Sequence, residues 1–153
     1  MPASEPIGEC MPRTALQAAV GRGKLMLTKL LIERGACINA PAAEDSGATA
    51  LQLACIHGYL EISRLLLELG ADVNARGAQK HGRTALEGAA EHGRIDTIQL
   101  LLSCGACTDG SYREQYLNAI LYAKRNRHFA AAALLKEHRV WSTEDEECYR
   151  RLQ

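Results

Sequence analysis

Apolar and polar positions along residues 47–74 predict two short helices. Leu51, Ala54 and Cys55 fall at i, i+3 and i+4, which places them on one face of a helix that ends at Gly58. A second helix, closed by Gly70, is indicated by leucines set among polar residues that are left for water: Leu60, Leu65, Leu66 and Leu67, with Glu61, Arg64 and Glu68. Because neither helix is long enough to be stable alone in water, the pair must be stabilised by stacking on its neighbours.

This pattern recurs with a fixed period. Three columns of marker residues each advance by 35 positions: Thr14, Thr49 and Thr84; Gly23, Gly58 and Gly93; Gly35, Gly70 and Gly105. Each threonine is suited to cap the helix that follows it. A period of this size is typical of repeat proteins, in which a unit buries its apolar face only by stacking on the next unit.

The sequence around each threonine resembles the ankyrin repeat. The family signature T-P-L-H-x-A appears as TALQAA from Thr14, TALQLA from Thr49 and TALEGA from Thr84. The GADVN ending at Asn74 and the run GYLEISRLLL in the second helix also match. Alanine replaces the usual proline in all three copies. The usual histidine is replaced as well, by Gln17, Gln52 and Glu87. The local hydrogen bonding must therefore differ from that of the family.

The resemblance covers roughly residues 10–138 and implies an all-α fold. We expect an ankyrin-repeat α-solenoid of about four stacked helix-turn-helix units with finger loops, formed by β-turns or hairpins, between them. The ankyrin-repeat domain is expected at 13–138, with repeats at approximately 14–48, 49–83, 84–116 and 117–138. Residues 1–12 are expected to form an N-terminal tail, and residues 139–153 a C-terminal capping helix or tail.

Two features depart from a regular array. Gly88 lies inside a predicted helix, where glycine costs about 1 kcal/mol relative to alanine, so tight interhelix packing is expected there. The fourth repeat is degenerate: aligning Ala123 with Ala90 gives a spacing of 33 and leaves neither a capping threonine nor the glycine. Terminal repeats face water on one side. Four basic residues are expected to do so here: Arg125, Arg127, Lys136 and Arg139.

The C-terminal segment VWSTEDEECYRRLQ predicts a short helix. Ser142 or Thr143 is suited to cap it, acidic residues 144–147 lie at its positive end, and Arg150 and Arg151 lie at its negative end. Trp141 is expected to fold back over the last repeat. The alternative is that this acidic and aromatic segment is a linear motif that binds a partner.

Composition narrows the possible partners. A formal net charge of zero gives no general attraction to nucleic acid or to an anionic membrane, and the chain has no long apolar run. The first residues, MPASEPIGECMPR, lack the basic and apolar regions of a secretory signal. We therefore expect an intracellular protein, cytoplasmic or nuclear, that is monomeric and binds neither nucleic acid nor membrane.

Cysteine and histidine residues do not indicate a metal, cofactor or catalytic site. Cys104 and Cys107 form a CxxC, but they flank a helix C-terminus, and no second pair completes the four ligands of a zinc site. All six cysteines are expected to be free thiols. His57 and His92 are one period apart, and stacked repeats are separated by roughly 8–10 Å, too far to share one zinc ion. No nucleophile and base are brought together by the register.

The sequence therefore favours a protein-binding module. It predicts no catalytic residue, no metal site and no cofactor. In the family that the chain resembles, partners usually bind the concave surface formed by the first helices and the fingers. The residues that this register directs to that surface are Arg13, Arg22, Ala48, Ile56, His57, Arg83, Glu91, His92, Lys124 and Arg125. Ile56 is expected to be an exposed apolar anchor, and Arg83, Lys124 and Arg125 favour a partner with an acidic segment.

Two other functions remain open at this stage. The chain could be a regulatory or sensor fragment of a larger multidomain signalling protein, because ankyrin arrays are often joined to signalling domains. A more remote alternative is a metal or redox protein that uses the cysteine and histidine residues.

Overall fold

The computed structural model describes residues 13–43 and 46–153, and the regular structure within these ranges is helical. Eight helices form four consecutive pairs: α1 (Ala15–Gly21) with α2 (Leu25–Glu33), α3 (Ala50–His57) with α4 (Leu60–Glu68), α5 (Ala85–Glu91) with α6 (Ile95–Ser103), and α7 (Arg113–Arg125) with α8 (Phe129–Glu137). A 3₁₀ turn at Gly110–Tyr112 precedes α7, and α9 (Thr143–Leu152) follows the last pair. Among the described residues the fingers contain a single β-bridge residue, Lys80, and no strand. The prediction of an all-α solenoid is confirmed.

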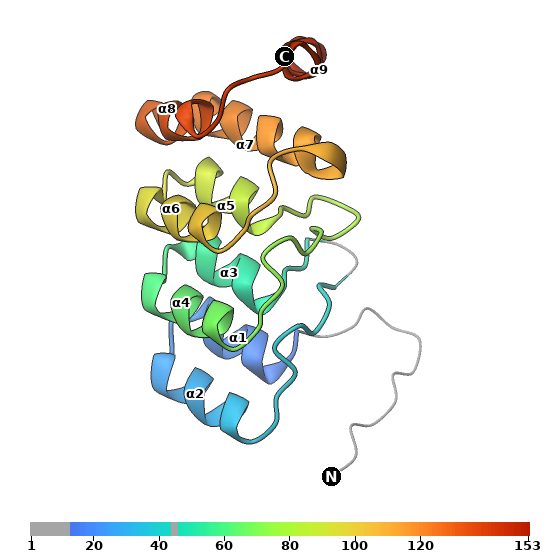
Figure 1. The fold of residues 1–153 in the computed structure, drawn as a ribbon. Helices are drawn as coiled ribbons and strands as arrows, with labels where there is room; N and C mark the ends of the chain where they lie inside the picture. The colour runs from blue at the N-terminus through green and yellow to red at the C-terminus, as the bar shows by residue number, and fades with distance from the viewer. Residues whose placement is uncertain (1–12, 44–45) are drawn as a thin grey trace.

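The four helix pairs stack in chain order into one array (Figure 1). Helices α1, α3, α5 and α7 form one layer, and α2, α4, α6 and α8 form the other. The long connections that follow α2 and α4 project from the same edge of the stack (Figure 1). Because each helix packs on its counterpart in the next pair, residues at equivalent positions of successive repeats lie in successive layers of the array.

Each of the first three pairs begins with a capping box. The hydroxyl of Thr49 accepts a hydrogen bond from the backbone N–H of Gln52 (3.2 Å), and Oε1 of Gln52 accepts one from the N–H of Thr49 (2.9 Å). Thr14 with Gln17 and Thr84 with Glu87 make the same pair of bonds. The expected capping by the threonines is therefore confirmed, and the residues that replace the usual histidine complete the cap.

The glutamines also hold the finger that follows their own helix pair. Nε2 of Gln52 donates to the carbonyl oxygens of Ala75 (3.0 Å) and Arg76 (2.9 Å). Gln17 donates in the same way to two consecutive carbonyl oxygens, those of Ala40 and Pro41. Glu87 has no N–H to donate, and the connection after α6 is a short loop and a 3₁₀ turn rather than a finger. The change from amide to carboxylate thus coincides with the loss of the finger.

Contacts between layers also recur with the period of the sequence. The ring of Tyr59 lies over Gly23, the side chain of Arg94 over Gly58, and the imidazole of His128 over Gly93, each so closely that a Cβ on the glycine would meet it at 2.6–2.9 Å. These glycines have φ between +65° and +74°, a conformation that glycine adopts without a steric penalty. Glycine is therefore required here both by the turn and by the approach of the next repeat.

The fourth repeat is spaced differently from the prediction. Arg127, with φ of +66°, takes the place that Gly93 has in the third repeat, and the fully buried Leu135 takes the place of Leu101. Both pairs are 34 residues apart, so the predicted spacing of 33 is wrong by one residue. The boundary expected at residue 117 falls inside α7, because the 3₁₀ turn lets that helix begin at Arg113. The extra turn at its start lengthens α7 to 13 residues.

Helix α9 packs against α7 at the end of the array (Figure 1). Ser142 caps it through a capping box with Asp145, as the sequence predicts, and Trp141 packs against the core. Arg139 does not face water as expected. Its guanidinium donates to both carboxylate oxygens of Asp145 (2.6 and 2.9 Å) and to the backbone oxygen of Thr108 (2.7 Å). The expectation failed because Asp145, six residues later, supplies a buried counter-ion.

Candidate protein-binding surface

Each helix of the first layer ends at an exposed basic residue. Arg22 and His92 are the C-terminal caps of α1 and α5, His57 is the last residue of α3, and Arg125 is the last residue of α7. We call these four residues the basic row. All four are exposed, and they lie at the negative ends of stacked helices, where a positive charge is stabilised by the helix dipole.

Members of the basic row are held to different extents. The ring of His57 stacks on that of Tyr59, with ring centroids 5.4 Å apart, and Nδ1 of His92 lies 3.0 Å from the carbonyl oxygen of Gly88. The side chains of Arg22 and Arg125 make no hydrogen bond or ion pair within the described part of the chain. The two guanidinium groups at the ends of the row are therefore available to a partner.

Arg83, by contrast, is already paired. Its Nε donates to Glu91 at 2.9 Å, and its guanidinium lies 4.2 Å from the ring centroid of Tyr122. About a quarter of each side chain is exposed, 28% for Arg83 and 27% for Glu91. Both residues belong to the surface that the sequence predicts for partner binding. The ion pair with Glu91 offsets part of the charge that Arg83 presents to an acidic partner.

A buried carboxyl group, that of Glu87, lies near the ion pair of Arg83 and Glu91. Glu87 lies one helical turn before Glu91 and is 7% exposed. Burial raises the pKa of Glu87, although hydrogen bonds from Thr84 and the charge of Arg83 act in the opposite direction. Asn118 of α7 also reaches this carboxyl group. The carboxyl group therefore lies at the contact between α5 and α7, and its role is to cap α5 and join the two repeats.

Two apolar residues of the predicted surface are part of the packing. Ala48 is 8% exposed and belongs to the core. Ile56 is only partly exposed, because it packs against Gly88: its Cγ1 lies 2.5 Å from the position that a Cβ on Gly88 would occupy. The prediction of tight packing at Gly88 is confirmed, and the same contact covers part of the Ile56 side chain, which was expected to be exposed. The side chain fills the space that glycine leaves in the next repeat.

Lys124 and Arg13 occupy the two ends of the array. Nζ of Lys124 donates to the hydroxyl of Tyr149 in α9 at 2.9 Å and lies 5.2 Å from its ring centroid. The guanidinium of Arg13 lies along α1, within 3.5 Å of the position of a Cβ on Gly21. Lys124 is exposed but engaged, so it contributes less to a partner site than its charge suggests.

Tyr122 and Tyr149, which were not predicted from the sequence, are two further aromatic components of this surface, besides Tyr59. Each lies under a basic side chain, Arg83 over Tyr122 and Lys124 over Tyr149. Tyr122 lies three residues before Arg125 on α7, a spacing that places both on one side of the helix. Helical spacing from the predicted Arg125 could therefore have found Tyr122. Nothing local in the sequence connects Lys124 to Tyr149.

The cysteines do not form a cluster. Cys37, Cys55, Cys104, Cys107 and Cys148 are free thiols, and Cys10 lies outside the described residues. Burial raises the pKa of the Cys55 thiol to about 12. In residues 13–43 and 46–153 no group of three or more His, Cys, Asp or Glu side chains is placed to bind a metal ion.

Comparison with known proteins agrees with this architecture. A family model described as ankyrin repeats (3 copies) matches residues 4–77, and one described as ankyrin repeats (many copies) matches residues 54–102. A search of the curated proteins found no match. Among solved structures, the ankyrin repeat domain of human ASB11 is similar, with a TM-score of 0.71 and 28% sequence identity. The similarity covers 84% of this chain and 55% of that domain, so the chain spans little more than half of its length. None of the described helices is both long and apolar enough to cross a membrane.

Proposed function

The chain belongs to the ankyrin-repeat family, and we propose that it is a non-enzymatic interaction module that binds an acidic segment of a partner protein through the basic row. Ankyrin repeats mediate protein–protein interactions, so the class of function follows from the family. The acidic partner is our proposal. It is supported by one observation above all: four stacked helices each end at an exposed basic side chain.

The geometry of the basic row favours an extended acidic segment over a single charge. Neighbouring helices of the first layer are expected at about 8–10 Å, so the row repeats its basic side chains at about the distance between every third residue of an extended chain. Carboxylates at this spacing can meet Arg22 at one end and Arg125 at the other. Arginine is well suited to this role because its planar guanidinium binds a carboxylate through two parallel hydrogen bonds.

The cations of the predicted surface differ in whether they already have a partner within the protein. Arg83 and Lys124, two further cations of the predicted surface, are held by Glu91 and Tyr149. Arg22 and Arg125 have no such partner in the described residues. We therefore assign the partner contacts chiefly to these two arginines, with His57 and His92 between them.

Parallel affinity capture tests the proposal. The bait is the full chain in three forms: wild type, a double variant Arg22→Glu and Arg125→Glu, and a control Arg34→Glu and Arg64→Glu. The control makes the same charge change at exposed arginines on the second layer of helices. A partner of the basic row is retained by wild type and control but lost by the double variant. Titration of that purified partner should give an affinity that falls steeply with salt, because exposed charges are screened. Equal capture by all three baits would contradict the assignment.

A further inference from the structure

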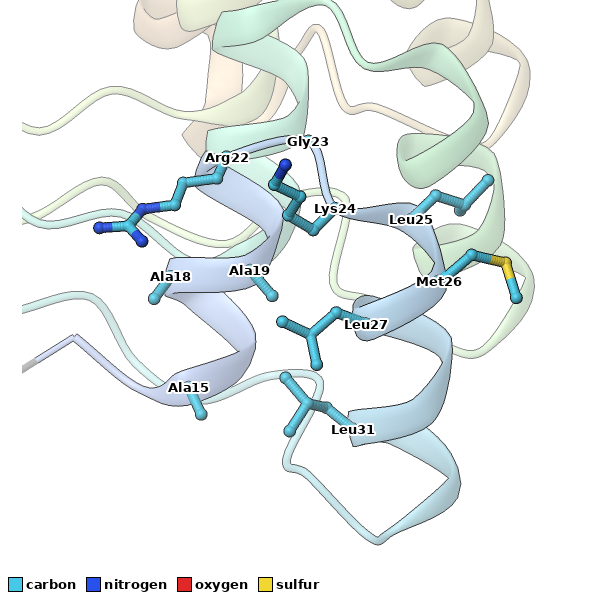
Figure 2. Close-up of a pocket in the computed structure, with 10 residues that line it drawn as sticks. All are labelled: Ala15, Ala18, Ala19, Arg22, Gly23, Lys24, Leu25, Met26, Leu27 and Leu31. Carbon is cyan, nitrogen blue, oxygen red and sulfur yellow. The ribbon is translucent and has the colours of Figure 1, made fainter.

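The outer face of the first repeat, on the side of α1 and α2 that points away from α3 and α4, is open and apolar. It holds a groove of about 780 Å³ between the two helices. Figure 2 shows the side chains of Leu27 and Leu31 directed from α2 toward α1, with Lys24 at the end of the groove where the helices meet. No described residue of the chain fills this groove.

The same positions in the next two repeats are buried. Leu27 is 46% exposed, whereas Ile62 and Thr97, one and two periods later, are 3% and 2% exposed. Leu31 is partly exposed, whereas its equivalents Leu66 and Leu101 are fully buried. In those repeats the preceding helix pair covers the face. The groove is thus the surface that each repeat uses to receive its predecessor.

Two backbone groups on this side of the first repeat also lack, among the described residues, the hydrogen bonds that their equivalents make in the later repeats. The carboxamide of Asn39 joins the first repeat to the second by donating to the carbonyl oxygen of Gly70 (3.0 Å) and accepting from the N–H of Asp72 (2.8 Å). Asn74 joins the second repeat to the third in the same way, through Gly105 (3.2 Å) and Cys107 (2.8 Å).

One period earlier, the equivalent groups are the carbonyl oxygen of Gly35 and the N–H of Cys37. Within residues 13–43 and 46–153 neither group has a hydrogen-bond partner. A carboxamide supplied from outside would satisfy both at once.

Lys24 completes the set. It stands two periods before Arg94, whose Nε donates to the carbonyl oxygen of Ile56 in the last turn of α3 (3.3 Å). By register, the ammonium group of Lys24 is placed to reach the last turn of a helix lying over α1. The unpaired carbonyl groups of a helix C-terminus are suitable acceptors for it.

We propose that this outer face is a stacking surface for one further helix pair of the ankyrin kind, presented by a partner protein. The partner unit would place aliphatic side chains in the groove, the C-terminus of its first helix over Lys24, and an asparagine side chain against Gly35 and Cys37. This contact shares only Arg22, which lines the groove, with the basic row, because it uses the edge of the array and not the ends of all four repeats.

A second copy of this chain is a poorer fit than another protein. Stacking in register needs the side of a repeat that faces its successor, and in this chain that side is covered by the next repeat or, at the fourth repeat, occupied along α7 by α9. The two asparagines at the joining position are already bonded. A second copy could offer only its own outer face, which carries no equivalent carboxamide.

A tethered probe tests the proposal, because a lone helix pair is not stable in water and a covalent link supplies a high effective concentration. A copy of residues 49–83 is inserted between Arg13 and Thr14 of the full chain, which keeps the period of 35. We expect the melting temperature to rise by about 4 °C or more. Exchange of the Cys37 amide hydrogen should slow by about tenfold or more, because that N–H becomes hydrogen-bonded.

Two matched variants keep the result specific. With alanine in place of the asparagine of the inserted copy, the protection of the Cys37 amide should be lost while the inserted helices still fold. With Leu27→Asp in the host repeat, the gain in melting temperature should disappear. Leu27→Asp in the chain without the insertion should change the melting temperature by less than about 2 °C, because Leu27 is exposed.

Three outcomes would overturn the proposal. An inserted copy that leaves both the melting temperature and the Cys37 exchange unchanged would show that the face does not accept a helix pair. A wild-type chain that is dimeric by light scattering, and monomeric after Leu27→Asp, would assign the face to a second copy. A Leu27→Asp chain that melts as low as Leu66→Asp would show that the face is already covered from within the chain.

Discussion

At the scale of single residues, the second and third repeats differ at the side chain that completes the capping box, which is an amide in one and a carboxylate in the other. Gln52 and Glu87 stand at the same register position, and both accept the threonine N–H that completes the capping box. Only the glutamine carries an N–H that can bind the carbonyl oxygens of the following finger. Both side chains therefore complete the cap, and only the glutamine also holds a finger.

Gln52→Glu separates these two roles. The carboxylate can still accept from Thr49, but it faces the carbonyl oxygens of Ala75 and Arg76 without a proton to donate. We expect the free energy of unfolding to fall by about 1–3 kcal/mol, as for other buried polar groups left without a partner. Chemical denaturation measures this change. Gln79→Glu, at an exposed finger position, is the control and should change stability by less than about 0.5 kcal/mol. Equal stability of the two variants would contradict the role given to Nε2.

At the scale of helices, the distance between α3 and α5 depends on Gly88. Alanine would favour the helix by about 1 kcal/mol, but its Cβ would lie 2.5 Å from Cγ1 of Ile56. Overpacking of this kind typically costs about 1–3 kcal/mol, because the neighbouring side chain must leave its rotamer or the helices must separate. The steric cost therefore exceeds the gain in helix propensity.

A double-mutant cycle tests this contact. Gly88→Ala alone should destabilise the chain, whereas Gly88→Ala in an Ile56→Ala background should be neutral or stabilising. The difference between the two effects should exceed about 0.5 kcal/mol, the level at which residues in contact cease to be additive. Denaturant titrations of the four proteins give the coupling energy. A Gly88→Ala effect that is the same in both backgrounds would show that Ile56 does not set the distance.

Helix α9 is attached by charge as well as by packing. Asp145 is 1% exposed and accepts hydrogen bonds from Arg139, Arg113 and Ser142. Hydrogen bonds from Arg139, with further bonds from Ser142, hold the pKa of the Asp145 carboxyl well below its usual range. Because the pKa is lowered in the folded chain, these bonds stabilise fully above the ordinary aspartate value of about 4 and are lost as the pH falls through the folded-state value.

Asp145→Ala should therefore release α9 while the rest of the array stays folded. Removing one member of a buried ion pair costs about 3–5 kcal/mol. Trp141, the single tryptophan of the chain, reports the change, since its ring packs edge-on against Tyr149 of α9 at 5.1 Å. We expect its fluorescence to shift to the red in the variant at pH 7, and in the wild type only well below pH 4. Glu146→Ala, an exposed neighbour on the same helix, should leave the spectrum unchanged.

At the scale of the whole molecule, the sequence period predicts the array but not its exceptions. Threonine caps, glycine turns and leucine positions recur within one repeat, so they could be identified locally. The stacking of Arg83 on Tyr122 and the partial burial of Ile56 depend on contacts with a neighbouring repeat. The 34-residue spacing of the fourth repeat could not be predicted, because Arg127 takes the left-handed conformation that glycine has in the other repeats, and an arginine gives no sign of it in the sequence. All four residues of the basic row belong to the surface that the sequence predicts. Only the structure shows that Arg83 and Lys124 already have partners, whereas Arg22 and Arg125 have none among the described residues.

The stacked core should also make the array unfold as one unit, although each repeat contacts only its neighbours. Leu66 is fully buried, on the face of the second repeat that the first repeat covers, and Leu66→Ala should cost about 2–5 kcal/mol. Far-UV circular dichroism follows all helices, whereas Trp141 fluorescence follows the far end of the array, two repeats away from the substitution. We expect both signals to shift to the same lower melting temperature. Leu69→Ala, at a neighbouring residue that is 47% exposed, should leave both within about 2 °C of wild type. If Leu66→Ala lowered the circular dichroism transition while the tryptophan signal stayed in place, the repeats would be unfolding independently and the array would not be cooperative.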